Sequence, residues 1–251
     1  MKNYVPVPTF VHSNVRLTIA DREYAFLNQP LSIYGIAGIR WPHFDPTSHA
    51  GEFLKLNAQV LCKQPYTLDL GGHITVEEAF SEQTKKTTYY LGVHIEMRAE
   101  DRERLSKTIA AEGFVPESYT RKFPRIPASS DIPDMPLRAL ARAPTGVAIS
   151  FEIMNLSPSG ILLCSDNPNA AAFAPGAGIH VEVEPRRLSL DPFKFDGLIC
   201  RRTTDRLSGK AGTLRRLFGI RFTNISKEHK QVFLDTLRTV LLRLQGTAQN
   251  K

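Results

Sequence analysis

The feature that most constrains how this chain folds is an internal repeat, because segments of its first half recur in the same order in its second half. The paired segments are LSIYGIAGIRW (31–41) with LSPSGILLCS (156–165), AGEFLKLNAQV (50–60) with PGAGIHVEVEP (175–185), YTLDLGGHITVEE (66–78) with FKFDGLICRRT (193–203), and YYLGVHIEMRAEDRERLSKTIAAEG (89–113) with RLFGIRFTNISKEHKQVFLDTLRTV (216–240). The spacing agrees as well, since Ser32 and Gly92 are 60 residues apart and Ser157 and Gly219 are 62. Four matches in one order predict a duplicated unit of roughly 100 residues.

Each copy is composed mainly of strands. The segment GIHVEVEP at 178–185 alternates apolar and polar residues with a period of two, which is typical of a half-buried strand. FDGLICR (195–201) and LFGIRF (217–222) read as further strands, and the glycine inside each suggests a bulge or a tight barrel corner. Several short strands at regular spacing favour a small closed sheet. The predicted fold is therefore mostly β, with two tandem small antiparallel β-barrels, each followed by an α-helix.

The helix that ends each copy has its own signals. In the second copy, Ser226 is placed as an N-cap and Glu228 complements the helix dipole in the first turn. The first copy has a shorter helix at about 100–112, with Leu105 and Ile109 on one face. The apolar stripe of the second helix consists of Phe233, Leu237, Val240, Leu241 and Leu244. Such a stripe usually packs on its own barrel, and the alternative is a docking or dimer surface.

A proline-rich segment, EGFVPESYTRKFPRIPASSDIPDMP, separates the two copies. Gly113 fits a helix C-cap, and the prolines after it favour an extended linker. We therefore predict a first domain at 1–112, a linker or switch segment at 113–125 and a second domain at 126–251.

Charge is distributed unevenly between the two copies. Residues 1–120 carry 12 Lys and Arg against 14 Asp and Glu, a net charge of −2, whereas residues 121–251 carry 20 against 11, a net charge of +9. The second copy is therefore the one suited to an anion. The three cysteines lack the spacing of a zinc site, no apolar run is long enough to span a membrane, and the first residues lack a signal peptide pattern, so we expect a cytoplasmic protein.

Basic residues gather in the centre of the linker, in RKFPRIPA. Arg121 and Arg125 are four residues apart, but Pro124 disfavours a helix between them. In an extended chain, two guanidinium groups can grip one planar or anionic ligand, and Lys122 could add a phosphate contact. The alternative is a solvated basic linker. A second pair with the same spacing, Arg138 and Arg142, lies close before NLSPSG and leaves little room for a strand and a turn.

The segment NLSPSG at 155–160 interrupts what otherwise reads as one apolar strand, and we expect these six residues to form a turn. Asn155 offers donors and an acceptor to a base edge, and the Ser157 hydroxyl with the turn amides can bind an anion. Gly160 allows close approach of a ligand or of another backbone. The alternative is a plain turn that links two strands.

Together, Arg121-x-x-x-Arg125 and Asn155-x-Ser157-x-x-Gly160 resemble the motifs of the PilZ domain family, and the resemblance extends over 121–245. The whole chain resembles two-domain receptors of the YcgR type. The resemblance implies a six-stranded β-barrel that binds cyclic di-GMP, often as a stacked dimer of the dinucleotide. It implies that the two arginines contact guanine and phosphate, and that the Asn and Ser contact guanine and ribose-phosphate. Asp is more usual than Asn at the first position of the second motif.

The first copy departs from these motifs where they matter. Pro30 stands at the position of Asn155, and no Arg-x-x-x-Arg precedes it, although Ser32 and Gly35 are retained. We therefore expect a degenerate barrel that binds a partner or its sister domain and not a nucleotide.

Signals for catalysis or metal binding are weak. The only His/Asp cluster consists of His43, Asp45 and His49, and a polar loop explains it better than a metal site. The sequence has no Walker-type phosphate loop and no GxSxG. We predict no enzyme activity, no metal and no cofactor.

The leading hypothesis is a cyclic di-GMP receptor in which the ligand draws the linker onto the second barrel and changes the arrangement of the two domains. By family analogy, its output is motility or a related surface behaviour through the flagellar motor or another effector, with recruitment to the flagellar basal body. A homodimer is a further expectation. One alternative is a cyclic di-GMP-responsive transcription regulator that contacts DNA through its basic segment at 201–216. Another is a structural member of the family that has lost the ligand.

Overall fold

The structure is a computed structural model that describes residues 9–115, 126–127, 137–184, 191–206 and 214–249, with the backbone alone at 37, 205–206 and 241–249. It divides into two compact units. The first unit comprises 1–77, 89–122 and 204–206, and the second comprises 78–88, 123–203 and 207–251. The domain boundaries predicted from the sequence, at 112 and 125, stay predictions.

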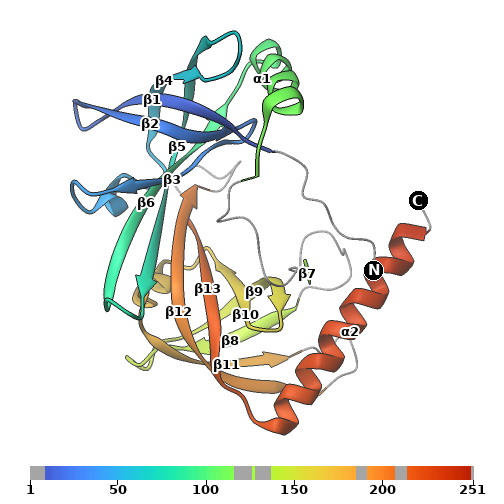
Figure 1. Cartoon of the computed structure of the whole chain (residues 1–251). Helices are drawn as coiled ribbons and strands as arrows, with labels where there is room; N and C mark the ends of the chain where they lie inside the picture. Colours follow the sequence, from blue (N-terminus) through green and yellow to red (C-terminus); the bar gives the residue numbers. More distant parts are fainter. Residues whose placement is uncertain (1–8, 116–125, 128–136, 185–190, 207–213, 250–251) are drawn as a thin grey trace. The chain divides into compact units, whose positions relative to one another are not determined.

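Six strands of the first half form one closed antiparallel barrel (Figure 1). They are β1 (Val11–Ile19), β2 (Arg22–Ser32), β3 (Gly35–Trp41), β4 (Phe53–Val60), β5 (Tyr66–Ser81) and β6 (Lys86–Glu96). Around the barrel the order is β1-β2-β3-β6-β5-β4, and β4 pairs with β1 to close it.

Six strands of the second half form another barrel, joined by the short β7 (Ile126–Pro127) on β9. They are β8 (Arg138–Arg142), β9 (Ala148–Ser157), β10 (Gly160–Ser165), β11 (Gly178–Glu184), β12 (Phe193–Arg206) and β13 (Leu214–Asn224). The order is β8-β9-β10-β13-β12-β11, closed by β11 on β8. This is the strand order of the first barrel, so the predicted fold of two tandem barrels is confirmed.

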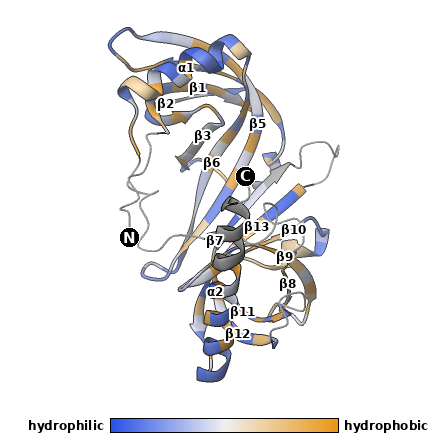
Figure 2. Cartoon of the chain, turned by 90° about the vertical axis from the view of Figure 1, so that its right-hand side faces the viewer, coloured by the Kyte–Doolittle hydropathy of each residue, from blue (hydrophilic) through white to orange (hydrophobic). Residues whose placement is uncertain are grey.

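Each barrel is filled by the inward-facing residues of its alternating strands. The pattern of β1, with every second residue buried from Val11 to Ile19, is typical. Figure 2 shows this alternation as bands of hydrophilic and hydrophobic colour along the strands. The core of the second barrel includes three rings that pack edge to face, Phe151, Phe173 and Phe218. The two cores are separate clusters of buried residues, one in each barrel.

A helix follows each barrel, as predicted. The helix α1 (Ala99–Glu112) buries Leu105 and Ile109 and ends at Gly113, whose amide donates to the carbonyl of Ile109. The helix α2 (Lys227–Gln249) begins after Ser226, whose hydroxyl accepts from the amide of His229 at 3.2 Å. Phe233, Leu237 and Val240 are buried in the core of the second barrel, so this part of the stripe packs on its own barrel. Among the described residues, no helix has the length and apolar character needed to cross a membrane.

One expectation about local structure was wrong. The predicted six-residue turn at 155–160 is a two-residue turn, Pro158–Ser159, because β9 continues through Ser157 and β10 begins at Gly160. The glycine of LFGIRF, Gly219, was predicted to mark a bulge or a tight barrel corner, and β13 keeps a continuous register with β10 across it, without a bulge in this pairing. What this glycine permits is instead the close approach of a side chain from β12.

Candidate ligand-binding site

A bulge in β9 gives two predicted site residues the same orientation. The register of β9 on β10 shifts between Leu162, which pairs with Asn155, and Leu163, which pairs with Ile153. Ile153 and Leu156 are both buried although they are three residues apart, so the extra residue changes the phase of the strand. Asn155 consequently points to the outer face of the barrel, together with Ser157.

The turn after β9 is held by the Ser157 side chain. Its hydroxyl donates to the carbonyl of Gly160 at 3.1 Å. The first barrel has the same turn, in which Ser32 donates to the carbonyl of Gly35 at 3.0 Å. Because the turn occurs in both barrels, its serine and glycine have a structural role, and Asn155 is the feature that distinguishes the second copy.

A side chain at Gly160 would collide with the opposite strand. A Cβ at this position would meet the backbone carbonyl oxygen of Ile220 on β13. The glycine therefore lets β10 lie close to β13, and it sets the depth of the surface beside the turn.

Asn155, Ser157 and Gly160 line one hollow of about 170 Å³ on the outer face of the second barrel. Its lining is made of residues from β9, β10, β12, β13 and the turn, namely Asn155, Ser157, Ser159, Gly160, Ile161, Cys200, Arg201, Gly219, Ile220 and Arg221. The structure thus brings together the three predicted site residues that it describes. It also adds two arginines, Arg201 and Arg221, that were not predicted.

The register explains why these residues meet. Ser157, Gly160 and Arg221 stand side by side across β9, β10 and β13. Asn155, Leu162 and Gly219 form the next row of the same face. The basic segment RRTTDRLSGKAGTLRR (201–216) was considered in the sequence only as a possible DNA contact. Its arginines belong to no recognised motif, so the sequence did not predict which face of the barrel they occupy.

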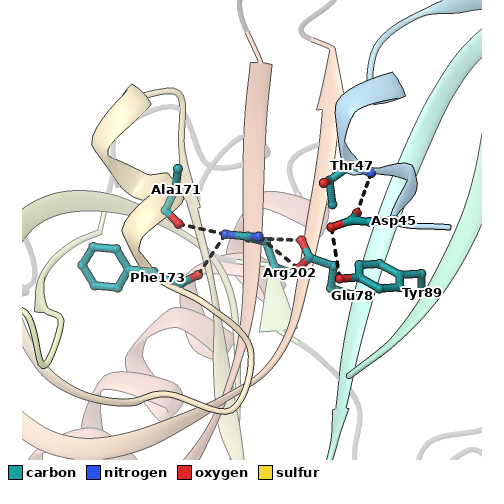
Figure 3. A network of polar contacts seen from close by, with 7 residues as sticks. All are labelled: Asp45, Thr47, Glu78, Tyr89, Ala171, Phe173 and Arg202. Atoms are coloured by element: carbon teal, nitrogen blue, oxygen red, sulfur yellow. Dashed lines mark hydrogen bonds and ion pairs between the residues drawn. The ribbon is translucent and has the colours of Figure 1, made fainter. Parts of the chain in front are cut away.

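Two glutamates of the β5–β6 hairpin, Glu78 and Glu82, form ion pairs with arginines of the second unit. Glu82 contacts the Arg221 guanidinium at 2.7 Å, and both side chains are about half exposed. Glu78 forms a bidentate ion pair with Arg202, with its two oxygens at 2.7 Å from Nε and 3.0 Å from a terminal nitrogen (Figure 3). Arg202 also donates to the carbonyls of Ala171 and Phe173. The exposed fractions are only 16% for the Arg202 side chain and 7% for that of Glu78, so this pair is a buried structural contact.

Arg121, Lys122 and Arg125 lie outside the described residues. Ile126, which directly follows Arg125 in the chain, pairs with Leu156, the residue between Asn155 and Ser157. The chain that leaves the linker is thus tied to the strand that carries the site.

The second arginine pair, Arg138 and Arg142, lies at the two ends of β8, and both side chains are exposed. The turn after β8 is short enough for β9 to begin at Ala148, so the spacing that argued against this pair does leave room for a turn and a strand. Neither arginine lines the hollow around Asn155.

Another hollow of the described surface is lined by charges of both signs. This hollow, about 810 Å³ in the first unit, combines the cations of Arg16, Lys55 and Arg98 with the carboxylates of Glu23 and Asp69. That mixture does not select an anion. No group of three His, Cys, Asp or Glu side chains is arranged for a metal within the described part of the chain.

The polar loop of the first unit has a structural explanation. Asp45 accepts from the amide of Thr47 at 2.9 Å and from the Tyr89 hydroxyl at 3.2 Å, capping a short 3-10 helix over Pro46–His49. His49 contacts Glu52 at 2.8 Å.

The cysteines differ in their surroundings. Cys62 and Cys200 are partly exposed, whereas Cys164 is buried. Burial raises the pKa of the Cys164 thiol, against the opposing effect of the Arg215 guanidinium, whose Nε lies 2.8 Å from its sulfur. Cys164 is therefore a protonated core residue, and Cys200 is the thiol that lines the hollow.

Comparison with known proteins gives one family match. Residues 119–238 match the family model described as PilZ domain. No curated protein matches the chain by sequence.

Several solved structures are similar at low identity. The MrkH–c-di-GMP complex of K. pneumoniae shares 11% identity, with 93% of this chain and 89% of that chain covered and a TM-score of 0.43. The PilZ domain of YcgR from Escherichia coli with c-di-GMP shares 19% identity, with 52% and 98% covered and a TM-score of 0.44. The Borreliella burgdorferi PlzA protein in complex with c-di-GMP shares 15% identity, with 90% and 87% covered and a TM-score of 0.29.

Proposed function

We propose that this chain is a non-catalytic receptor for cyclic di-GMP, because residues 119–238 match the PilZ domain model. The observation that carries the proposal is the joint exposure of Asn155, Ser157 and Gly160 in one hollow inside the matched segment. The hollow is small for a dinucleotide, so further residues have to complete the site. The linker residues Arg121 and Arg125, with Lys122 as a weaker contact, are proposed to do so.

The proposed roles follow from the chemistry of each group. Asn155 presents an amide to a guanine edge, and Ser157, whose hydroxyl donates to Gly160, presents its oxygen as an acceptor to a ribose hydroxyl of the ribose-phosphate. Arg121 and Arg125 supply flat, permanently charged groups that stack on a base or bind phosphate oxygens. Because Ile126 pairs with Leu156, the chain that follows Arg125 lies beside Asn155. The two arginines therefore need only a short movement to reach a ligand in the hollow.

Calorimetric titration with cyclic di-GMP tests the proposal. The wild type is expected to bind with a micromolar or lower Kd, and Arg121→Ala or Arg125→Ala to weaken binding roughly 100-fold, since hydrogen bonds to charged groups contribute about 1.5–3 kcal/mol each. Arg142→Ala is the matched control, because Arg138 and Arg142 have the same spacing but lie outside the hollow. A wild-type protein that does not bind would refute the receptor assignment, and loss of binding in Arg142→Ala alone would move the clamp to β8.

Thiol protection tests the location of the site independently. Cyclic di-GMP is expected to slow the alkylation of Cys200 by N-ethylmaleimide, because this residue lines the hollow. Cys62, partly exposed in the first unit, is the internal control and should react at an unchanged rate. Peptide mass spectrometry after timed labelling measures both rates in one sample. Binding without protection of Cys200 would place the ligand elsewhere.

We further propose that ligand binding draws the linker onto the second barrel and changes the arrangement of the two domains. By family analogy, this change regulates motility or a related surface behaviour through a protein partner in the cytoplasm. Coupling of this kind needs only a ligand that binds one arrangement of the two domains better than the other. The ligand stoichiometry, including a stacked dimer, would be read from the same titration.

A further inference from the structure

Arg201 is a basic residue of the hollow that belongs to neither motif. It lies on β12 and lines the hollow together with Asn155 and Ser157. Its side chain is partly buried, so its charge is held near the barrel wall.

Gly219 determines how the Arg201 side chain lies. A Cβ built at position 219 would stand 2.7 Å from Cγ, 3.3 Å from Cδ and 2.8 Å from Nε of Arg201. Three consecutive atoms of the side chain therefore cross directly over this glycine. Because Phe218 and Ile220 are buried in the barrel, the side-chain direction of Gly219 is outward, toward the face that carries the hollow.

This arrangement brings the guanidinium within reach of the ligand proposed above. Asn155, Leu162 and Gly219 are aligned across three neighbouring strands. With strands about 4.8 Å apart, Asn155 and the Arg201 stem over Gly219 are separated by roughly 10 Å. A ligand with two bases and two phosphates is long enough to contact both.

We propose that Arg201 is a further ligand-binding residue of this site, contacting the cyclic dinucleotide through its guanidinium, and that Gly219 is its positioning residue. The inference rests on the proposed function. It places one arginine of the site on the rigid barrel wall, where its position does not depend on the linker. A guanidinium suits this position because it binds phosphate with a planar fork and stacks on a base with its face.

Calorimetry with cyclic di-GMP on the full chain tests the two roles. Arg201→Gln is expected to weaken binding about tenfold or more, as loss of a charged hydrogen-bonding group does. Gly219→Ala is expected to cause a similar loss, because the added methyl group displaces the Arg201 stem. The double variant should bind no more weakly than Arg201→Gln alone, since Gly219 acts through Arg201. Arg201→Lys should recover little of the affinity, because lysine lacks the planar group.

Two control variants separate this role from general effects. Arg142→Gln removes one positive charge from an exposed strand position outside the hollow, and Gly178→Ala adds a methyl group where no atom lies within 4 Å. Both should bind like the wild type, and thermal unfolding should show that Gly219→Ala remains folded. Wild-type binding with no effect of Arg201→Gln, full recovery by Arg201→Lys, or additive losses in the double variant would each overturn the inference. A wild type that does not bind would instead overturn the receptor function, and the inference with it.

Discussion

Replacing Glu78 by glutamine is expected to lower the free energy of unfolding by about 3 kcal/mol, because it leaves the Arg202 guanidinium buried without its carboxylate. The two contacts between these side chains, at 2.7 and 3.0 Å, satisfy both oxygens of the carboxylate. With exposed fractions of 7% and 16%, the pair is poorly reached by water and counterions, so the loss should persist at high salt. Urea denaturation followed by circular dichroism measures it.

The hairpin that carries Glu78 also provides the matched control. Glu82→Gln removes the contact with Arg221, but there both side chains are about half exposed, with values of 47% and 48%. Exposed ion pairs contribute at most about 1 kcal/mol, so this variant should unfold nearly like the wild type, and any loss should shrink with added salt. Equal losses in the two variants would contradict the distinction between the buried and the exposed pair.

Gly160→Ala is expected to weaken cyclic di-GMP binding about tenfold or more and to lower the free energy of unfolding by about 1–3 kcal/mol, as overpacking against a fixed backbone does. The added Cβ would collide with the carbonyl oxygen of Ile220, which belongs to a strand and cannot swing aside as a side chain can. Separating β10 from β13 would also shift the turn that holds Ser157. Calorimetry and urea denaturation measure the two effects.

Gly35→Ala separates the two effects of the substitution at Gly160. Gly35 occupies the same place in the first barrel, where a Cβ would meet the carbonyl oxygen of Val93, and its φ of +144° disfavours other residues. This variant should be destabilised as well, yet bind the ligand with unchanged affinity. Gly178→Ala, with open space around it, should change neither property by more than about 0.5 kcal/mol. Weak ligand binding by Gly35→Ala would show that binding reports stability and not the site.

The repeat predicted the fold well because segments that recur in the same order along the chain form strands in the same order in each barrel. Both barrels have one strand order, and the Ser-x-x-Gly turn recurs with the same hydrogen bond in each. The length of the turn was wrong for a physical reason. The residue types of NLSPSG predicted a turn over all six residues, whereas a bulge beside Asn155 lets β9 continue through Ser157 with its phase reversed.

The candidate site was only partly accessible to sequence reasoning. Asn155, Ser157 and Gly160 are local, and their spacing alone placed them at one turn. Arg221 comes to the hollow through the pairing of β13 with β10, and Arg201 through β12, the next neighbour of β13, so both depend on contacts between residues far apart in the chain. Gly219 was predicted to mark a bulge or a tight barrel corner, and the Arg201 side chain that lies across it could not be predicted from the sequence.

The composition of the second unit limits how this protein can be divided into working fragments. Residues 78–88 precede α1 in the chain, yet they belong to the unit that contains β8 to β13. A fragment that starts after the linker would keep the barrel and every described residue of the hollow. It would lose Glu78, however, and the Arg202 guanidinium would then lack its carboxylate partner. Any binding measured on such a fragment would therefore describe an altered barrel, and only the whole chain reports the native site.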